Sequence, residues 1–110
     1  MVKFKTMKQE MYKIKIRVVE IRGSGKCPAG LKVGDTFEID ANGQPVPINF
    51  CGWAFVSLWP FITPLRYGGT LPWEKDPDKA YVSCPDPENT VIFEISREKD
   101  KKEYKEPPVF

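Results

Sequence analysis

Residues 11–22, MYKIKIRVVEIR, constrain the fold of this chain more than any other segment. Over the first half of the segment, apolar side chains alternate with basic ones: Tyr12, Ile14, Ile16 and Val18 against Lys13, Lys15 and Arg17. This period of two predicts a strand with one buried face and one solvated face. The alternation slips at Val18-Val19, and because a one-residue slip would turn the core face outward, it predicts a β-bulge there.

Three more segments have the composition of strands. Residues 36–40, TFEID, place Phe37 and Ile39 on one face. Residues 80–84, AYVSC, and 90–96, TVIFEIS, flank the turn sequence PDPEN. We therefore expect the last two strands to pair as a hairpin.

Residues 51–67 are predicted to form the main helix of the chain. Apolar side chains recur there at helical spacing: Phe55, Leu58, Trp59, Ile62 and Leu65. Gly68-Gly69 provides a C-terminal stop. Pro60 and Pro64 each remove a backbone donor, so we expect the helix to kink near Trp59 or to break into two short pieces.

The order strand, strand, helix, strand, strand predicts an α+β fold: an antiparallel sheet or a small open barrel with one kinked helix packed on it. Residues 45–49, PVPIN, should be extended. We expect one domain over 11–97, preceded by an N-terminal extension over 1–10. Residues 98–110 form a charged tail that is predicted to be disordered or frayed.

The segment 51–61, CGWAFVSLWPF, has more aromatic side chains than one sheet face can cover. Loops, a second subunit or a ligand pocket could cover the remainder, and a simple core helix is an equally weighted interpretation. Large exposed apolar patches are uncommon on monomers, so we favour loops together with a homo-oligomer interface through this helix. Trp53, Phe55 and Arg66 are the candidate ligand contacts, although Arg66 is most simply explained as a partner of the helix dipole or as a surface ion pair.

Composition excludes several kinds of site. The chain has no histidine, so it cannot by itself build a Ser-His-Asp or Cys-His site, and a zinc site would need Cys, Asp or Glu. No apolar run approaches the ~20 residues that a membrane helix needs. MVKFKTMKQE lacks the apolar region of a secretion signal, so we expect a cytoplasmic protein.

The charge of the chain disfavours nucleic acid as its main partner, because the net charge is only +2. The basic face formed by Lys13, Lys15 and Arg17 could contact phosphates. We prefer the interpretation that these side chains are solvated and protect a sheet edge from pairing.

The three cysteines, Cys27, Cys51 and Cys84, are the main candidates for chemistry. They form no CxxC motif, so no standard zinc ribbon or redox pair is present. Each one lies near the end of a predicted element, so the three could converge in space. Three thiolates could bind zinc or iron with an external fourth ligand. A disulfide would leave the third thiol unpaired.

Cys51 has a second interpretation because it lies where the helix should begin. The positive end of the helix dipole favours a thiolate, which is the form that attacks electrophiles and binds metals. Cys51 is therefore also the candidate catalytic nucleophile or redox group. A small buried core residue is the simpler alternative.

Five short motifs, CPAGLKVGDTFEID, CGWAF, LRYGG, LPWEKDPD and CPDPEN, resemble those of a family of small uncharacterised three-cysteine proteins from archaea and anaerobic bacteria. The resemblance covers about residues 11–97 and matches Cys27, Cys51 and Cys84 to family positions. It implies a shared fold, while the family has no assigned activity. Members often carry a histidine near the position of Leu31, which this chain lacks.

The sequence thus leaves three hypotheses for the function. The first is an accessory protein that binds a metal or small ligand through clustered cysteines. The second is a thiol-dependent enzyme with Cys51 as its nucleophile or redox group. The third is a structural or nucleic-acid-interacting module that uses Lys13, Lys15 and Arg17. We rank them in that order.

Overall fold

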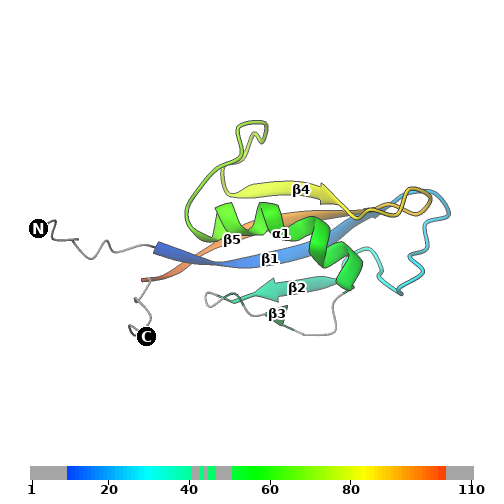
Figure 1. Ribbon diagram of the computed structural model, residues 1–110, viewed down its shortest axis with the longest axis horizontal. Coiled ribbons are helices and arrows are strands. Elements are labelled where there is room, and N and C mark those ends of the chain that lie inside the picture. The colour runs from blue at the N-terminus through cyan, green and yellow to red at the C-terminus, as the bar shows by residue number, and fades with distance from the viewer. Residues whose placement is uncertain (1–9, 41–42, 44, 47–50, 104–110) are drawn as a thin grey trace, which may run out of the picture.

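The computed structural model describes residues 10–40, 43, 45–46 and 51–103. These residues form one antiparallel five-stranded sheet in the order β3-β2-β1-β5-β4, crossed on one face by a single helix (Figure 1). The elements are β1 (Glu10–Ile21), β2 (Thr36–Ile39), β3 (Pro45–Val46), α1 (Gly52–Arg66), β4 (Lys79–Ser83) and β5 (Val91–Glu103). The predicted α+β fold is confirmed, and the sheet is open because β3 and β4 form its two edges.

The central pair, β1 and β5, confirms the predicted bulge. The register of the two strands shifts between Val18 and Glu20, so that Val18 pairs with Phe93 and Ile21 pairs with Val91. A second irregularity, between Tyr12 and Ile14, was not expected from the sequence. The predicted hairpin is also confirmed, because β4 pairs antiparallel with β5.

The position of β1 corrects one sequence interpretation. β1 lies between β2 and β5, so both of its backbone edges are hydrogen-bonded. Lys13, Lys15 and Arg17 therefore cannot be protecting a sheet edge. They lie on the sheet face opposite α1, because Ile14, Ile16 and Val18 are buried beneath the helix.

β5 is longer than the sequence indicated. It continues to Glu103, through part of the stretch that was expected to be a disordered tail, and pairs with residues 10–12 of β1. The run EKDKKE has low strand propensity. It is nevertheless extended, because the backbone of β1 beside it supplies hydrogen bonds that do not depend on the side chains. Residues 1–9 and 104–110 lie outside the described part of the chain.

The core lies between α1 and the sheet. The helix buries Ala54, Leu58, Ile62 and Leu65 against side chains that include Ile16, Phe93 and Ile95. Each large side chain buried in this way contributes about 1.5–3 kcal/mol. Phe55 and Trp59, which the spacing had placed in the same row, are only half-buried and stack on each other with ring centroids 5.2 Å apart.

Helix α1 does not break into two pieces at its prolines. Pro60 is exposed, and the carbonyl it leaves without a donor belongs to Val56, whose side chain is also exposed. Water can therefore hydrogen-bond to that carbonyl. The expected stop is confirmed: the N–H groups of Gly68 and Gly69 donate to the carbonyls of Leu65 (3.3 Å) and Pro64 (2.8 Å), which is the Schellman arrangement.

Arg97 joins three segments at the end of α1 that is away from Cys51. Its side chain is only 7% exposed and forms an ion pair with Asp78 at 2.9 Å. The guanidinium also donates to the carbonyls of Leu65 (3.2 Å), Gly69 (2.8 Å) and Pro77 (2.9 Å). It lies 4.9 Å from the centre of the Tyr12 ring, at a cation–π distance.

We expect Arg97→Met to lower the free energy of unfolding by about 2–4 kcal/mol, because the ion pair with Asp78 is lost and three carbonyls, two of them in part-buried hydrogen bonds, lose their donor. Arg97→Lys should recover only part of this loss, since an ammonium group cannot donate in the same planar fork. Urea denaturation measures both values. Arg22→Met, at the exposed pair with Glu20, is the control and should change stability by less than about 1 kcal/mol. Equal effects at the two positions would contradict this role of Arg97.

Candidate functional site: a pocket lined by three cysteines

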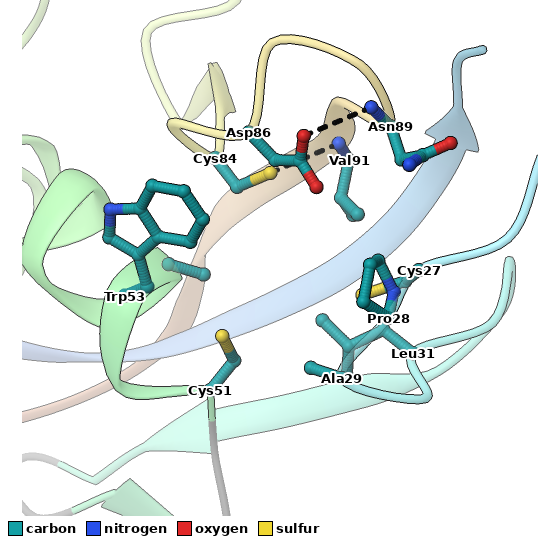
Figure 2. Close-up of a pocket in the computed structure, with 11 residues that line it drawn as sticks. Cys27, Pro28, Ala29, Leu31, Cys51, Trp53, Cys84, Asp86, Asn89 and Val91 are labelled. Atoms are coloured by element: carbon teal, nitrogen blue, oxygen red, sulfur yellow. Dashed lines mark hydrogen bonds between the residues drawn. The ribbon is translucent and has the colours of Figure 1, made fainter.

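Cys27, Cys51 and Cys84 line one pocket of about 120 Å³. The pocket lies at the N-terminal end of α1, between the loop that joins β1 to β2 and the loop that joins β4 to β5 (Figure 2). All three cysteines are free thiols. The sequence left open whether cysteines at element ends converge, and the structure places all three at this one pocket.

Cys51 is the N-cap residue of α1, as the sequence indicated. Its backbone is extended (φ −64°, ψ 115°), and its carbonyl accepts the first helical hydrogen bond from Phe55 at 2.9 Å. The side chain makes no capping hydrogen bond, unlike the usual serine or aspartate cap. Figure 2 shows its sulfur pointing into the pocket.

Cys84 follows β4 directly and is hydrogen-bonded to Val91, the first residue of β5. The backbone N–H of Val91 donates to its Sγ at 3.2 Å, and its own N–H donates to the carbonyl of Val91 at 2.9 Å. The sulfur is thus an acceptor with a fixed partner (Figure 2). Of the three thiols, it has the most defined orientation.

Cys27 begins a tight turn in the loop between β1 and β2. The N–H of Gly30 donates to the carbonyl of Cys27 at 2.9 Å, and Gly30 has a positive φ of 88°. The side chain is half-buried and packs against the edge of the core, as do those of Cys51 and Cys84.

The loops that carry Cys27 and Cys84 are fastened to each other. Gly23 lies directly against the loop between β4 and β5, because a Cβ built on it would come within 1.8 Å of the carbonyl oxygen of Glu88. Beside this contact, Oδ1 of Asn89 accepts hydrogen bonds from the Oγ (2.6 Å) and the N–H (3.2 Å) of Ser24. The relative position of the two cysteines therefore depends on a close backbone approach that requires glycine.

The remaining walls of the pocket are mainly apolar. They are formed by Pro28, Ala29, Leu31, Trp53, Ala54 and Val91, with Asp86 and Asn89 as the polar members. Trp53 is 60% exposed, which places part of its ring at the rim. Asp86 is engaged within its own loop, where Oδ1 accepts from the N–H groups of Glu88 (3.0 Å) and Asn89 (3.1 Å). The thiols are thus the groups best placed to meet a ligand.

Only part of the predicted set of ligand contacts lies at this pocket. Trp53 lines it, whereas Phe55 and Arg66 do not. Arg66 lies at the opposite end of α1, where it is buried and where Gly43 packs closely against its guanidinium. The rings of Tyr67 (5.1 Å) and Trp59 (5.9 Å) flank it at cation–π distances, and its burial places it inside the fold rather than on the surface.

The sequence did not single out the loop residues of the pocket as ligand contacts. Asp86 and Asn89 belong to the PDPEN turn after Cys84, and Pro28 and Ala29 follow Cys27 directly. The available signal was the turn composition beside two of the cysteines.

The described residues contain no group of three or more Cys, Asp or Glu side chains arranged to hold a metal ion. Figure 2 shows the three cysteines on different sides of the pocket. A metal-binding role for these thiols stays a prediction.

Comparison with protein-family models, with curated proteins and with solved structures gave no match. The resemblance to a three-cysteine family therefore also stays a prediction. In the part of the chain that the structure describes, no helix has the length and apolar composition needed to cross a membrane.

Gly23→Ala should displace the loop that carries Cys27, because the new Cβ would overlap the carbonyl of Glu88. We expect a loss of about 2–4 kcal/mol in the free energy of unfolding and faster reaction of the pocket thiols with Ellman's reagent. Gly25→Ala is a matched control: it has the same positive φ (77° against 71°), but nothing lies within 4 Å of its Cβ position. Identical losses for the two variants would show that backbone strain alone matters.

Proposed function

We propose that this chain is a small binding protein whose pocket holds a soft, thiophilic ligand through Cys27, Cys51 and Cys84. One observation carries the proposal: three cysteines far apart in the sequence line the same pocket, and its other walls are mainly apolar. Thiol sulfur is a soft donor that prefers zinc, iron or copper(I) among metals. It also suits small uncharged molecules that carry a soft or electrophilic centre.

The state of the polar groups favours binding over acid–base chemistry. The side-chain oxygens of the two polar members of the lining are already engaged: Asn89 joins the two loops through Ser24, and Asp86 holds the turn of its own loop. The chain has no histidine to act as a general base. The pocket can therefore orient a ligand and exclude water from it, and the thiols supply the specific contact.

The size of the pocket limits the ligand. An engineered protein cavity of about 150 Å³ binds benzene, so a pocket of about 120 Å³ suits a guest of a few heavy atoms. A metal ion would require the three sulfurs to turn toward a common point. Cys84 would then have to keep or exchange its hydrogen bond from Val91.

The test combines elemental analysis of anaerobically purified protein with thiol titration of the same sample. For a metal ligand we expect stoichiometric zinc or iron, and protection of all three thiols that a chelator removes. For a small molecule we expect no metal, and a guest detected by native mass spectrometry that protects the thiols. Each of Cys27→Ser, Cys51→Ser and Cys84→Ser should weaken retention, whereas exposed Ser83→Ala should not.

Two results would contradict this function. The first is that all three thiols of the native protein react as fast as those of the urea-unfolded protein, with neither metal nor guest bound. The pocket would then hold no ligand. One thiol at Cys51 that reacts far faster than the other two would favour the thiol-dependent enzyme instead. Two observations support that alternative. The Cys51 side chain makes no capping hydrogen bond, and the first turn of α1 has no acidic residue that would offset the positive end of the helix dipole.

The outer side of α1 supports a homo-oligomer as part of the proposal. Trp53 is 60% exposed and Val56 is 73% exposed, and the helix carries no charged residue except the buried Arg66. An uncharged apolar surface is complementary to a second copy of itself in a two-fold dimer.

We expect Val56→Glu to shift the protein from dimer to monomer without loss of folding, because a charge would then be buried in the interface. Light scattering after size-exclusion chromatography measures the mass. Thr70→Glu, at an exposed position beyond the helix, is the control and should leave the mass unchanged. A wild-type protein that is monomeric at high concentration would exclude the interface.

A further inference from the structure

The sheet face opposite α1 carries a second hollow, also about 120 Å³, which is unrelated to the cysteine pocket. Its walls come from three strands: Lys15 and Arg17 on β1, Glu94 and Ser96 on β5, and Lys79 on β4. Since β1, β5 and β4 are neighbours in the sheet, these side chains lie side by side on one surface. The described helix does not cover this face, because α1 packs on the other one.

The hollow has three cations and one carboxylate. Glu94 is 3.6 Å from Arg17 and 3.8 Å from Lys79, which are long distances for ion pairs, and both cations keep more than a third of their side chains exposed. Lys15 is exposed and has no ion pair within the described part of the chain. The side chains that line the hollow therefore carry a net positive charge, while Glu38 on β2, which lies across from Lys15, is paired with Lys13 at 3.1 Å.

An aromatic ring borders these cations. Tyr81 on β4 is 50% exposed, and its hydroxyl donates to Oε2 of Glu94 at 2.8 Å. This hydrogen bond to a carboxylate raises the pKa of the Tyr81 phenol, so the group stays neutral. The Glu94 contact restrains the ring while about half of its surface remains open to a partner.

We propose that this face binds a single-stranded nucleic acid, with phosphates contacting Lys15, Arg17 and Lys79 and a base stacking on Tyr81. Proteins that bind single strands without sequence preference usually combine cations placed along the phosphate backbone of the nucleic acid with exposed aromatic rings on which bases stack. The central position of β1 supports this assignment, because its basic side chains have no edge to protect. The nearly neutral net charge is not an objection, since β4 adds Lys79 and Tyr81 to the β1 cations at one place.

The first experiment measures fluorescence anisotropy of labelled single strands of about 12 nucleotides, a length in the range covered by small single-strand-binding domains. Three phosphate contacts predict a slope of log K against log salt of about −2, or roughly a 20-fold loss of affinity between about 50 and 200 mM salt. No binding at low salt would overturn the proposal.

A pair of triple variants locates the site. Lys15→Gln, Arg17→Gln and Lys79→Gln together should weaken binding by at least about tenfold. Lys26→Gln, Lys32→Gln and Lys75→Gln together remove the same charge from exposed positions in two loops and should change it less than about threefold. Equal losses would show that only the total charge matters and would overturn the site.

Two single variants test the roles of the neighbours. Tyr81→Leu should weaken binding without changing the salt slope, because it removes stacking and no charge. Glu94→Gln should strengthen binding, because the cations lose their competing carboxylate. Displacement of the strand by polyglutamate at the same charge concentration, or an unchanged affinity in Tyr81→Leu, would show a general polyanion surface and overturn the proposal.

Discussion

The buried guanidinium of Arg97 is the interaction on which the arrangement of this fold depends. It connects β5, the C-terminal end of α1 and the segment before β4 through one ion pair and three carbonyls. The core between the helix and the sheet is apolar, and such packing is non-directional. Arg97 thus adds directional hydrogen bonds between β5 and the end of the helix. Cys51 and Trp53 lie at the other end of the same helix, so this contact helps to position the pocket wall that they form.

The pocket illustrates how distant sequence segments become one site without a sequence motif. A helix start supplies Cys51, a strand end supplies Cys84, and a loop supplies Cys27. Two of the three supports are joined by the contact of Gly23 with Glu88 and by the hydrogen bonds between Ser24 and Asn89. The opposite face of the sheet is built differently, from alternating side chains of three adjacent strands. The same sheet therefore carries thiols and apolar side chains at the pocket beside the start of α1, and charged side chains on the face that α1 does not cover.

Periodicity predicted the parts of this structure that follow local rules. The alternation in β1, the bulge at Val18, the hairpin of β4 with β5 and the glycine stop after Tyr67 all follow from neighbouring residues. What could not be predicted depends on partners that are distant in the chain. Glu103 is in a strand because Glu10 lies beside it, Arg97 is buried because three carbonyls converge on it, and Arg66 is enclosed by Gly43 and two rings. The approach of the three cysteines was anticipated only as a consequence of their positions at element ends.

The two ends of α1 are secured very differently. Its last turn is closed by Gly68 and Gly69 and gripped by Arg97, whereas its first turn has neither a side-chain cap nor an acidic residue. A helix fastened at one end frays from the other. We therefore expect any local opening of this helix to begin at Cys51 and Trp53, so that the pocket would lose this wall before the rest of the helix leaves the sheet.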